Sequence, residues 1–154
     1  MKIGMIGMGF VGGNTAKVLE SAHEIKSYDK FQDPYTDPSV LRDTEVVFLS
    51  VPTPMKPSGA IDYSPIHNSL ETLTEATDRS YRPLVVVRST AVSGTTDALD
   101  LRYPFHFAFN PEFLREGRAI RDFTSPDRVV IGVESDKAKE IMKRIYAPME
   151  RTEN

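Results

Sequence analysis

Short, mostly apolar runs alternate along the chain with polar stretches in which apolar residues recur every three or four positions. Continuous apolar runs of about four to eight residues are typical of buried parallel strands, and the longer period is typical of amphipathic helices. Strands are predicted at residues 1–7, 23–28, 45–51, 83–88, 105–109 and 128–133. The alternation predicts an α/β fold, a doubly wound (Rossmann) sheet of six parallel strands in the order 3-2-1-4-5-6, within a single domain.

The helices between the strands are predicted from capping residues and apolar stripes. They are expected from about Val11, over residues 38–41, from Asp62 or Ser64, from near Gly94 or Thr95, and over residues 136–146. A further helical turn is predicted to open at Pro111 or Glu112, which would place Glu112 and Glu116 on one face. Acids in a first turn also complement the helix dipole, so this pattern leaves Glu112 open between a structural and a functional role.

The most informative segment is Gly7-Met8-Gly9-Phe10-Val11-Gly12, which follows the first predicted strand and opens the first predicted helix. In this G-x-G-x-x-G pattern Gly7 allows a tight turn, Gly9 lets the backbone approach a pyrophosphate, and Gly12 lets the helix pack closely on the strand. The free N–H groups of the helix N-terminus then attract phosphate. A flexible glycine turn is the alternative, but strand, motif and helix occur in the order that dinucleotide binding requires.

Asp29 ends the second predicted strand, 20 residues after Gly9. An acid at this spacing accepts hydrogen bonds from the adenosine ribose diol. It would repel the 2′-phosphate of NADP, which favours NAD, although Lys30 would partly offset that repulsion. Residues 1–147 are therefore predicted to form an NAD-binding Rossmann domain, and residues 148–154 a polar tail or the start of a truncated linker.

Polar residues follow two further predicted strands, at the edge where ligands gather in a doubly wound sheet. Thr53 lies between two prolines after the third strand, and either touches the ribose side of the cofactor or belongs to a rigid exit turn. Ser89 and Thr90 follow the fourth strand, and either contact the cofactor or cap the next helix. The residues alone leave both alternatives open.

Composition and charge exclude several classes of protein. The 154 residues carry a formal net charge of −3, without the basic excess that binding to nucleic acid or to an anionic membrane requires. No apolar run approaches ~18 residues, so neither a membrane span nor a signal peptide is predicted. The chain has no cysteine, which agrees with a cytoplasmic location. His23, His67 and His106 lack metal-ligand spacing, so no metal site is predicted.

Four blocks carry a family resemblance that covers nearly the whole chain. They are residues 7–12, 51–54 (Val-Pro-Thr-Pro), 88–96 (Arg-Ser-Thr-Ala-Val-Ser-Gly-Thr-Thr) and 110–123 (Asn-Pro-Glu-Phe-Leu-Arg-Glu-Gly-Arg-Ala-Ile-Arg-Asp-Phe). The last block continues to Ser-Pro-Asp-Arg-Val-Val-Ile-Gly at 125–132. With these blocks in this order, the chain resembles the N-terminal domain of the nucleotide-sugar 6-dehydrogenases. Such enzymes oxidise the C6 alcohol of the sugar to a carboxylate in two NAD-dependent hydride transfers.

The resemblance implies roles for individual residues. Glu112 matches the acid that acts as general base, and Thr90 matches a threonine that hydrogen-bonds near the reacting centre. Substrate contacts are implied for Glu112, Phe113, Leu114 and Arg115. Cofactor contacts are implied for Gly7, Gly9, Phe10, Val11, Gly12, Asp29, Lys30, Val51, Pro52, Thr53, Ser89, Thr90 and Glu116.

The chain departs from the family pattern in ways that bear on activity. The cysteine nucleophile of the family is absent. The lysine and asparagine that hold the oxyanion come from a helix that would follow this domain, as would the domain that grips the nucleotide. The chain alone is therefore expected to bind NAD without completing the four-electron oxidation. Its expected partners are the missing C-terminal half of the enzyme and a UDP-sugar or related nucleotide-sugar substrate. The alternatives are a non-catalytic NAD-binding module and another β-hydroxyacid-type dehydrogenase, which would not predict residues 110–123.

Overall fold

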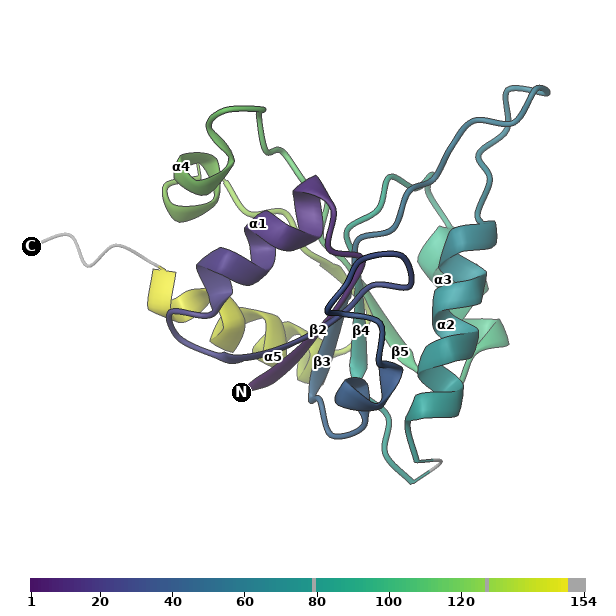
Figure 1. The fold of residues 1–154 in the computed structure, drawn as a ribbon, viewed down its shortest axis with the longest axis horizontal. Helices are drawn as coiled ribbons and strands as arrows, with labels where there is room; N and C mark the ends of the chain where they lie inside the picture. The colour runs from purple at the N-terminus through teal and green to yellow at the C-terminus, as the bar shows by residue number, and fades with distance from the viewer. Residues whose placement is uncertain (79, 127, 150–154) are drawn as a thin grey trace, which may run out of the picture.

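The computed structural model describes residues 1–78, 80–126 and 128–149, and Figure 1 shows their fold. In these ranges six strands form one sheet in the order β2-β1-β3-β4-β5-β6. The strands are β1 (Lys2–Ile6), β2 (Glu24–Tyr28), β3 (Val46–Leu49), β4 (Leu84–Val87), β5 (His106–Phe109) and β6 (Gly132–Val133). Neighbouring strands from β2 to β5 are parallel, whereas β6 is antiparallel to β5. The predicted six-stranded α/β fold is confirmed.

Two features of the predicted sheet are wrong, the strand order and the all-parallel pairing. The predicted order places the third strand on the outer side of the second, but β3 pairs with β1. This is because the connection between β2 and β3 contains only the 3₁₀ helix η1 (Pro38–Leu41). The observed order is that of a Rossmann sheet that lacks the strand outside β2 and gains an antiparallel edge strand.

The sixth strand is also shorter than the predicted span of residues 128–133. The side-chain amide of Asn110 donates a hydrogen bond to the carbonyl of Val130 at 2.8 Å. That carbonyl is one of the groups that a longer strand would offer to its neighbour. The chain therefore joins the sheet only at Gly132 and Val133.

Helices cover both faces of the sheet (Figure 1). α1 (Phe10–Leu19), α4 (Ala119–Thr124) and α5 (Asp136–Tyr146) bury their apolar residues in one cluster, and α2 (Ser64–Ala76), α3 (Thr95–Arg102) and η1 bury theirs in a second. β3 contributes to both, with Val46 and Phe48 in the first cluster and Val47 and Leu49 in the second. Burial on both faces explains why this strand is apolar throughout.

The helices predicted from capping residues and apolar stripes are confirmed. The helical turn predicted at Pro111 or Glu112 is wrong, because the next helix begins only at Ala119. The Glu112 carboxylate accepts a hydrogen bond from the backbone N–H of Leu114. Such a local side-chain bond offers the backbone an alternative to helical hydrogen bonding. Glu112 and Glu116 therefore share no helical face.

The 3₁₀ helix η2 (Ala147–Met149) follows α5 directly, and Met149 packs against the first cluster. The rest of the predicted tail, residues 150–154, lies outside the described residues. None of the helices in the described ranges combines the length and the hydropathy needed to cross a membrane.

Candidate cofactor site

The glycine motif forms the turn between β1 and α1, at the carboxyl end of the sheet. Gly7 has a φ of +89°, and a Cβ at this position would lie 2.6 Å from the carbonyl oxygen of Ser50. Only glycine satisfies both conditions without strain. The turn is therefore pressed against the end of β3, at the place where the chain order of the strands reverses between β1 and β3. In open α/β sheets this switch point is where ligands bind.

Gly12 and Gly9 have different surroundings. A Cβ on Gly12 would lie 1.8 Å from the carbonyl oxygen of Gly7, so α1 packs directly on the strand exit. A Cβ on Gly9 would meet nothing within 4 Å, and Gly9 gives α1 no side-chain cap. The first N–H groups of a helix have no partner within it and carry its positive dipole end. The motif thus offers open space at Gly9 and N–H donors without a partner within the helix, which fit a diphosphate.

Asp29 connects the end of β2 to this motif. One carboxylate oxygen accepts the backbone N–H of Met8 at 2.7 Å, and the other accepts that of Phe31 at 2.9 Å. Each oxygen retains a further lone pair for a ligand hydroxyl. The Lys30 ammonium lies 5.8 Å from the centroid of the exposed Phe31 ring. The predicted juxtaposition of the acid and the glycine motif is thus present in the fold.

The exit segments of β3 and β4 are tied together. Ser89 is 7% exposed, and its hydroxyl donates a hydrogen bond to the carbonyl of Val51 at 2.6 Å. Pro52 and Thr90 are exposed, and Thr53 is partly exposed. The Ser89 hydroxyl therefore holds the two segments in register, while the side chains of the neighbouring residues face outward.

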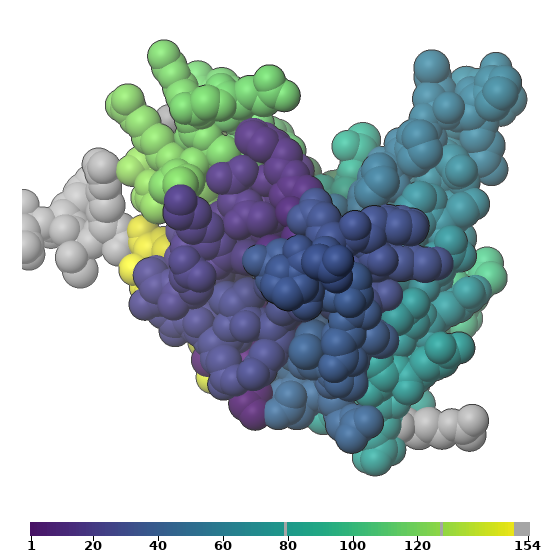
Figure 2. All heavy atoms as spheres, in the orientation of Figure 1, coloured from purple at the N-terminus to yellow at the C-terminus, as the bar shows by residue number. Residues whose placement is uncertain are grey.

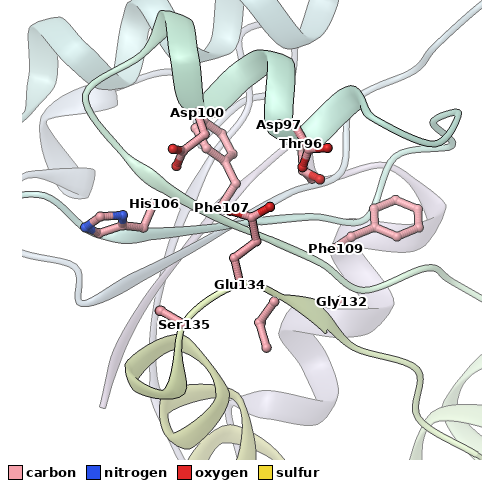
Figure 3. Close-up of a pocket in the computed structure, with 10 residues that line it drawn as sticks. Thr96, Asp97, Asp100, His106, Phe107, Phe109, Gly132, Glu134 and Ser135 are labelled. Atoms are coloured by element: carbon pink, nitrogen blue, oxygen red, sulfur yellow. The ribbon is translucent and has the colours of Figure 1, made fainter.

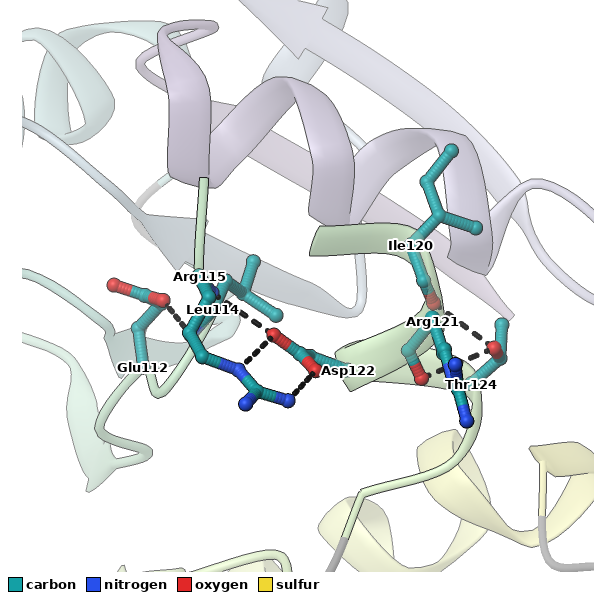
Figure 4. Close-up of polar contacts among 7 residues, drawn as sticks. All are labelled: Glu112, Leu114, Arg115, Ile120, Arg121, Asp122 and Thr124. Atoms are coloured by element: carbon teal, nitrogen blue, oxygen red, sulfur yellow. Dashed lines mark hydrogen bonds and ion pairs between the residues drawn. The ribbon is translucent and has the colours of Figure 1, made fainter. Parts of the chain in front are cut away.

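The segment after β5 carries the predicted substrate residues. Leu114 packs against the first apolar cluster, whereas Phe113 is 55% exposed and lies 5.7 Å from the Arg128 guanidinium. Arg115 binds Asp122 through two side-chain hydrogen bonds, at 2.7 and 3.1 Å (Figure 4). Hydrogen bonds from Arg115 lower the pKa of the Asp122 carboxyl to about 2. Asp122 was not among the predicted site residues, because seven positions separate it from Arg115.

The predicted residues gather at one end of the sheet but in separate contact groups. The exits of β1, β3, β4 and β5 are neighbours because these strands are adjacent and parallel. Figure 2 shows the surface hollowed here, between the start of α1 and the projecting segment around the Met55–Ile61 bridge. Thr90 and Glu112 follow adjacent strands, yet no hydrogen bond joins them within the described part of the chain.

A cavity of about 410 Å³ lies elsewhere, between α3 and the β5–β6 edge (Figure 3). Asp97, Asp100, His106 and Glu134 line it. Over residues 1–78, 80–126 and 128–149, no group of acidic and histidine side chains is arranged to hold a metal ion. None of the predicted cofactor residues lines this cavity.

The comparisons with known proteins identify the family of this chain. Residues 26–150 match the profile described as "UDP-glucose/GDP-mannose dehydrogenase family, NAD binding domain", so the glycine motif itself precedes the matched range. The UDP-glucose 6-dehydrogenase of Rickettsia bellii is 36% identical over 114 residues, which are 71% of this chain and 26% of that protein. The UDP-glucose 6-dehydrogenase AglM of Haloferax volcanii is 37% identical over 132 residues, 74% of this chain and 29% of that protein.

Solved structures give the same result. A ternary complex of GDP-mannose dehydrogenase from Pseudomonas aeruginosa superposes with a TM-score of 0.83 at 27% identity, over 97% of this chain and 45% of the other. A UDP-glucose dehydrogenase from Pyrobaculum islandicum gives a TM-score of 0.84 at 26% identity, over 97% and 44%. The chain spans about a quarter of the length of the curated relatives that it matches. It belongs to the UDP-glucose/GDP-mannose dehydrogenase family, carries the NAD-binding domain of that family, and has NAD as its cofactor.

Proposed function

We propose that this chain is the NAD-binding part of a nucleotide-sugar 6-dehydrogenase and that it folds as a single doubly wound domain. In the complete enzyme it takes part in the oxidation of UDP-glucose or a related UDP-sugar to the uronate. The observation that carries the proposal is the hydrogen bond between Asp29 and Met8, which joins an acid at the end of β2 to an uncapped, glycine-lined helix start. The proteins named UDP-glucose 6-dehydrogenase that resemble this chain support the choice of substrate class.

The adenosine diphosphate half of NAD is assigned to the first β-α-β unit. Backbone N–H groups from Gly9 to Gly12 would hold the diphosphate, with Phe10 and Val11 supplying the two donors between them. The remaining lone pairs of Asp29 would accept the ribose hydroxyls. A 2′-phosphate would lie against the same carboxylate, so NAD is preferred to NADP, with Lys30 reducing the difference.

The nicotinamide half is assigned to the exits of β3 and β4. Val51, Pro52 and Thr53 follow β3, and Ser89 and Thr90 follow β4. The hydrogen bond from Ser89 to Val51 supports a common surface for these residues. Glu116, exposed on the segment after β5, is assigned to the same half of the cofactor.

The reacting sugar is assigned to the segment after β5. Glu112 would take the proton of the C6 hydroxyl as general base, with Thr90 donating a hydrogen bond near the same centre. Bound NAD supplies the hydride acceptor. Phe113, Leu114 and Arg115 would border the sugar nucleotide, with Arg115 held in place by Asp122. Glu112 is partly buried, and closure by sugar and cofactor would shield it further from water.

The second oxidation needs groups that this sequence does not contain. Its nucleophile in the family is a cysteine, and the chain has none. We therefore propose that the remainder of the enzyme supplies the cysteine, the oxyanion donors and the nucleotide-binding domain. A non-catalytic NAD-binding module derived from the same family is the alternative, and a turnover measurement distinguishes the two.

Two measurements test the proposal. Calorimetric titration of the folded chain with NAD should show saturable binding, and no heat at millimolar NAD would refute the cofactor site. UDP-glucose should then produce NADH absorbance when the remaining part of a relative is supplied in trans. NAD binding without any turnover under those conditions would favour the non-catalytic module.

A further inference from the structure

A buried arginine lies directly before Ser89 and Thr90. Arg88 is 6% exposed, and its guanidinium lies near two aromatic rings, 5.5 Å from the centroid of Phe123 and 6.0 Å from that of Phe48. In residues 1–78, 80–126 and 128–149 it forms no ion pair with a carboxylate, and its Nε has no hydrogen-bond partner. A buried charge without a counter-ion is costly. Stability alone therefore does not explain this arginine.

The hydrogen-bond partners of Arg88 are neutral side chains. Its Nη1 donates to the Asn110 carbonyl oxygen at 2.5 Å and to the Tyr146 hydroxyl oxygen at 3.2 Å. The Tyr146 hydroxyl in turn donates to the same Asn110 oxygen at 2.5 Å. Burial raises the pKa of Tyr146, so the hydroxyl stays protonated and remains a donor. These three residues, here named the Arg88 triad, form a closed set of hydrogen bonds.

The triad joins three elements at the carboxyl end of the sheet. Arg88 follows β4 and precedes Ser89 and Thr90, whereas Asn110 follows β5 and precedes the segment 111–115. Tyr146 is the last residue of α5 and connects both to the helical layer. A small cavity of about 50 Å³ is lined by all three residues together with Phe113 and Leu114. The triad therefore fixes the spacing between the two exit segments that carry the proposed nicotinamide and substrate residues.

We propose that Arg88, Asn110 and Tyr146 are positioning residues for the nicotinamide end of the site. The inference rests on the proposed function, because it assigns the segments on either side of the triad to cofactor and substrate. The guanidinium and the phenol both donate to the side-chain carbonyl of Asn110, and this fixes the β5 exit against the β4 exit. An apolar side chain of similar length at position 88 would remove the unpaired charge at little cost in stability. It would also remove the side-chain link between the two segments, which would then be joined here by the backbone hydrogen bond from Asn110 to Val87.

Comparing the binding of two ligands distinguishes the two halves of the cofactor site. NAD uses both halves, whereas ADP-ribose lacks the nicotinamide, so the ratio of the Kd for ADP-ribose to the Kd for NAD reports the nicotinamide end alone. Both constants are measured by calorimetry for the unmodified chain, Tyr146→Phe and Arg88→Met, and Tm is measured in parallel. Tyr103→Phe is the matched control, since its hydroxyl also makes a sheltered hydrogen bond, 2.9 Å from Nδ1 of His67, within the second cluster.

In Tyr146→Phe and Arg88→Met we expect the Kd ratio to be at least threefold lower than in the unmodified chain, with the Kd for ADP-ribose unchanged. We also expect Arg88→Met to melt at or above the Tm of the unmodified chain. Tyr103→Phe should keep the ratio. A ratio that stays constant in the triad variants would overturn the inference, even if Tm falls, as would a ratio of one in the unmodified chain. If Arg88→Met fails to fold, Tyr146→Phe decides, because its ring still packs on Phe123. Failure of the unmodified chain to bind NAD would instead refute the proposed function.

Discussion

The carboxylate of Asp29 accepts a hydrogen bond from the backbone N–H of Met8 at 2.7 Å, and this bond ties the end of β2 to the glycine motif. The second carboxylate oxygen is held by the N–H of Phe31. The acid is therefore oriented by the protein itself before any ligand arrives. A preorganised acceptor loses little conformational freedom when a ribose binds, which favours affinity.

Replacing Asp29 by Asn tests this arrangement. The amide nitrogen of Asn would face one of the two backbone N–H donors, and the charged acceptor for the ribose would be lost. Since a hydrogen bond to a charged group contributes about 1.5–3 kcal/mol, we expect the Kd for NAD to rise by about tenfold or more. The preference for NAD over NADP should narrow. Calorimetry measures both ligands, and Asp33→Asn, an exposed acid in the same loop, is the control. An unchanged Kd would remove Asp29 from the ribose site.

A substitution at Gly9 separates an effect on NAD binding from an effect on stability. A Cβ at this position meets no atom within 4 Å, so Gly9→Ala should fold with an unchanged Tm. The methyl group would, however, enter the space assigned to the diphosphate, and we expect the Kd for NAD to rise by about tenfold or more. Titration and thermal melting of the same sample check both statements. Unaltered affinity would show that the diphosphate does not approach Gly9.

Gly12 should behave in the opposite way. A Cβ there would lie 1.8 Å from the Gly7 carbonyl oxygen, and backbone atoms cannot give way as a flexible side chain would. Overpacking costs about 1–3 kcal/mol, so we expect Gly12→Ala to lower Tm by about 2–12 °C. Gly132→Ala is the control, because its Cβ would make only ordinary contacts, at 3.6 Å or more. Equal melting temperatures for the two variants would contradict the close packing of α1 on β1.

The positions of the strands could be predicted from the sequence, but their order could not. Burial on both faces makes a strand such as β3 continuously apolar, and this signal is local. The order of the strands in the sheet depends on which face of the sheet each connecting segment covers. Leu41 in η1 is buried among residues of α2, on the face opposite α1, and this placement carries the chain from β2 across β1 to β3. In the sequence Leu41 is a single apolar residue in a polar loop, and this pattern does not show which face of the sheet it covers.

In the candidate site, too, the local features could be predicted from the sequence and the contacts between distant residues could not. The glycine motif and Asp29 could be predicted because strand, turn and helix are consecutive and the acid ends the next strand. The Arg88 triad could not, because its three hydrogen bonds join residues 22, 36 and 58 positions apart. An arginine at the end of an apolar strand suggests a solvated side chain, and only the packing of Phe48, Phe123 and Tyr146 buries it.

The Arg115–Asp122 pair predicts a stability change at acidic pH. Arg115 lowers the pKa of Asp122 from 3.8 to about 2. A carboxyl with a lowered pKa in the folded state stabilises that state above pH 3.8, and its contribution is lost as the pH falls toward 2. We expect Asp122→Asn to lower Tm at pH 6 and to melt like the unmodified chain near pH 2. A Tm difference of the same size at both values would rule out an ionic origin. Glu140→Gln, which breaks the exposed Lys143 pair, should have little effect at either pH.

Substitutions of Glu112 and Glu116 should have opposite effects on kcat and on the Kd for NAD, measured with the remainder of the enzyme supplied. Glu112 is assigned to proton transfer, and general-base catalysis contributes about 10²–10⁴-fold, so Glu112→Gln should lower kcat by at least about 100-fold. Because Glu112 is not assigned to binding NAD, the Kd for NAD should stay within about twofold, as expected for a group needed only in the transition state. Glu116→Gln should instead raise the Kd for NAD and reduce kcat less. NADH absorbance and calorimetry give the two quantities. Equal losses of turnover and affinity in Glu112→Gln would show that Glu112 acts as a binding group, and the general base would then have to come from another residue at the exits of β4 and β5.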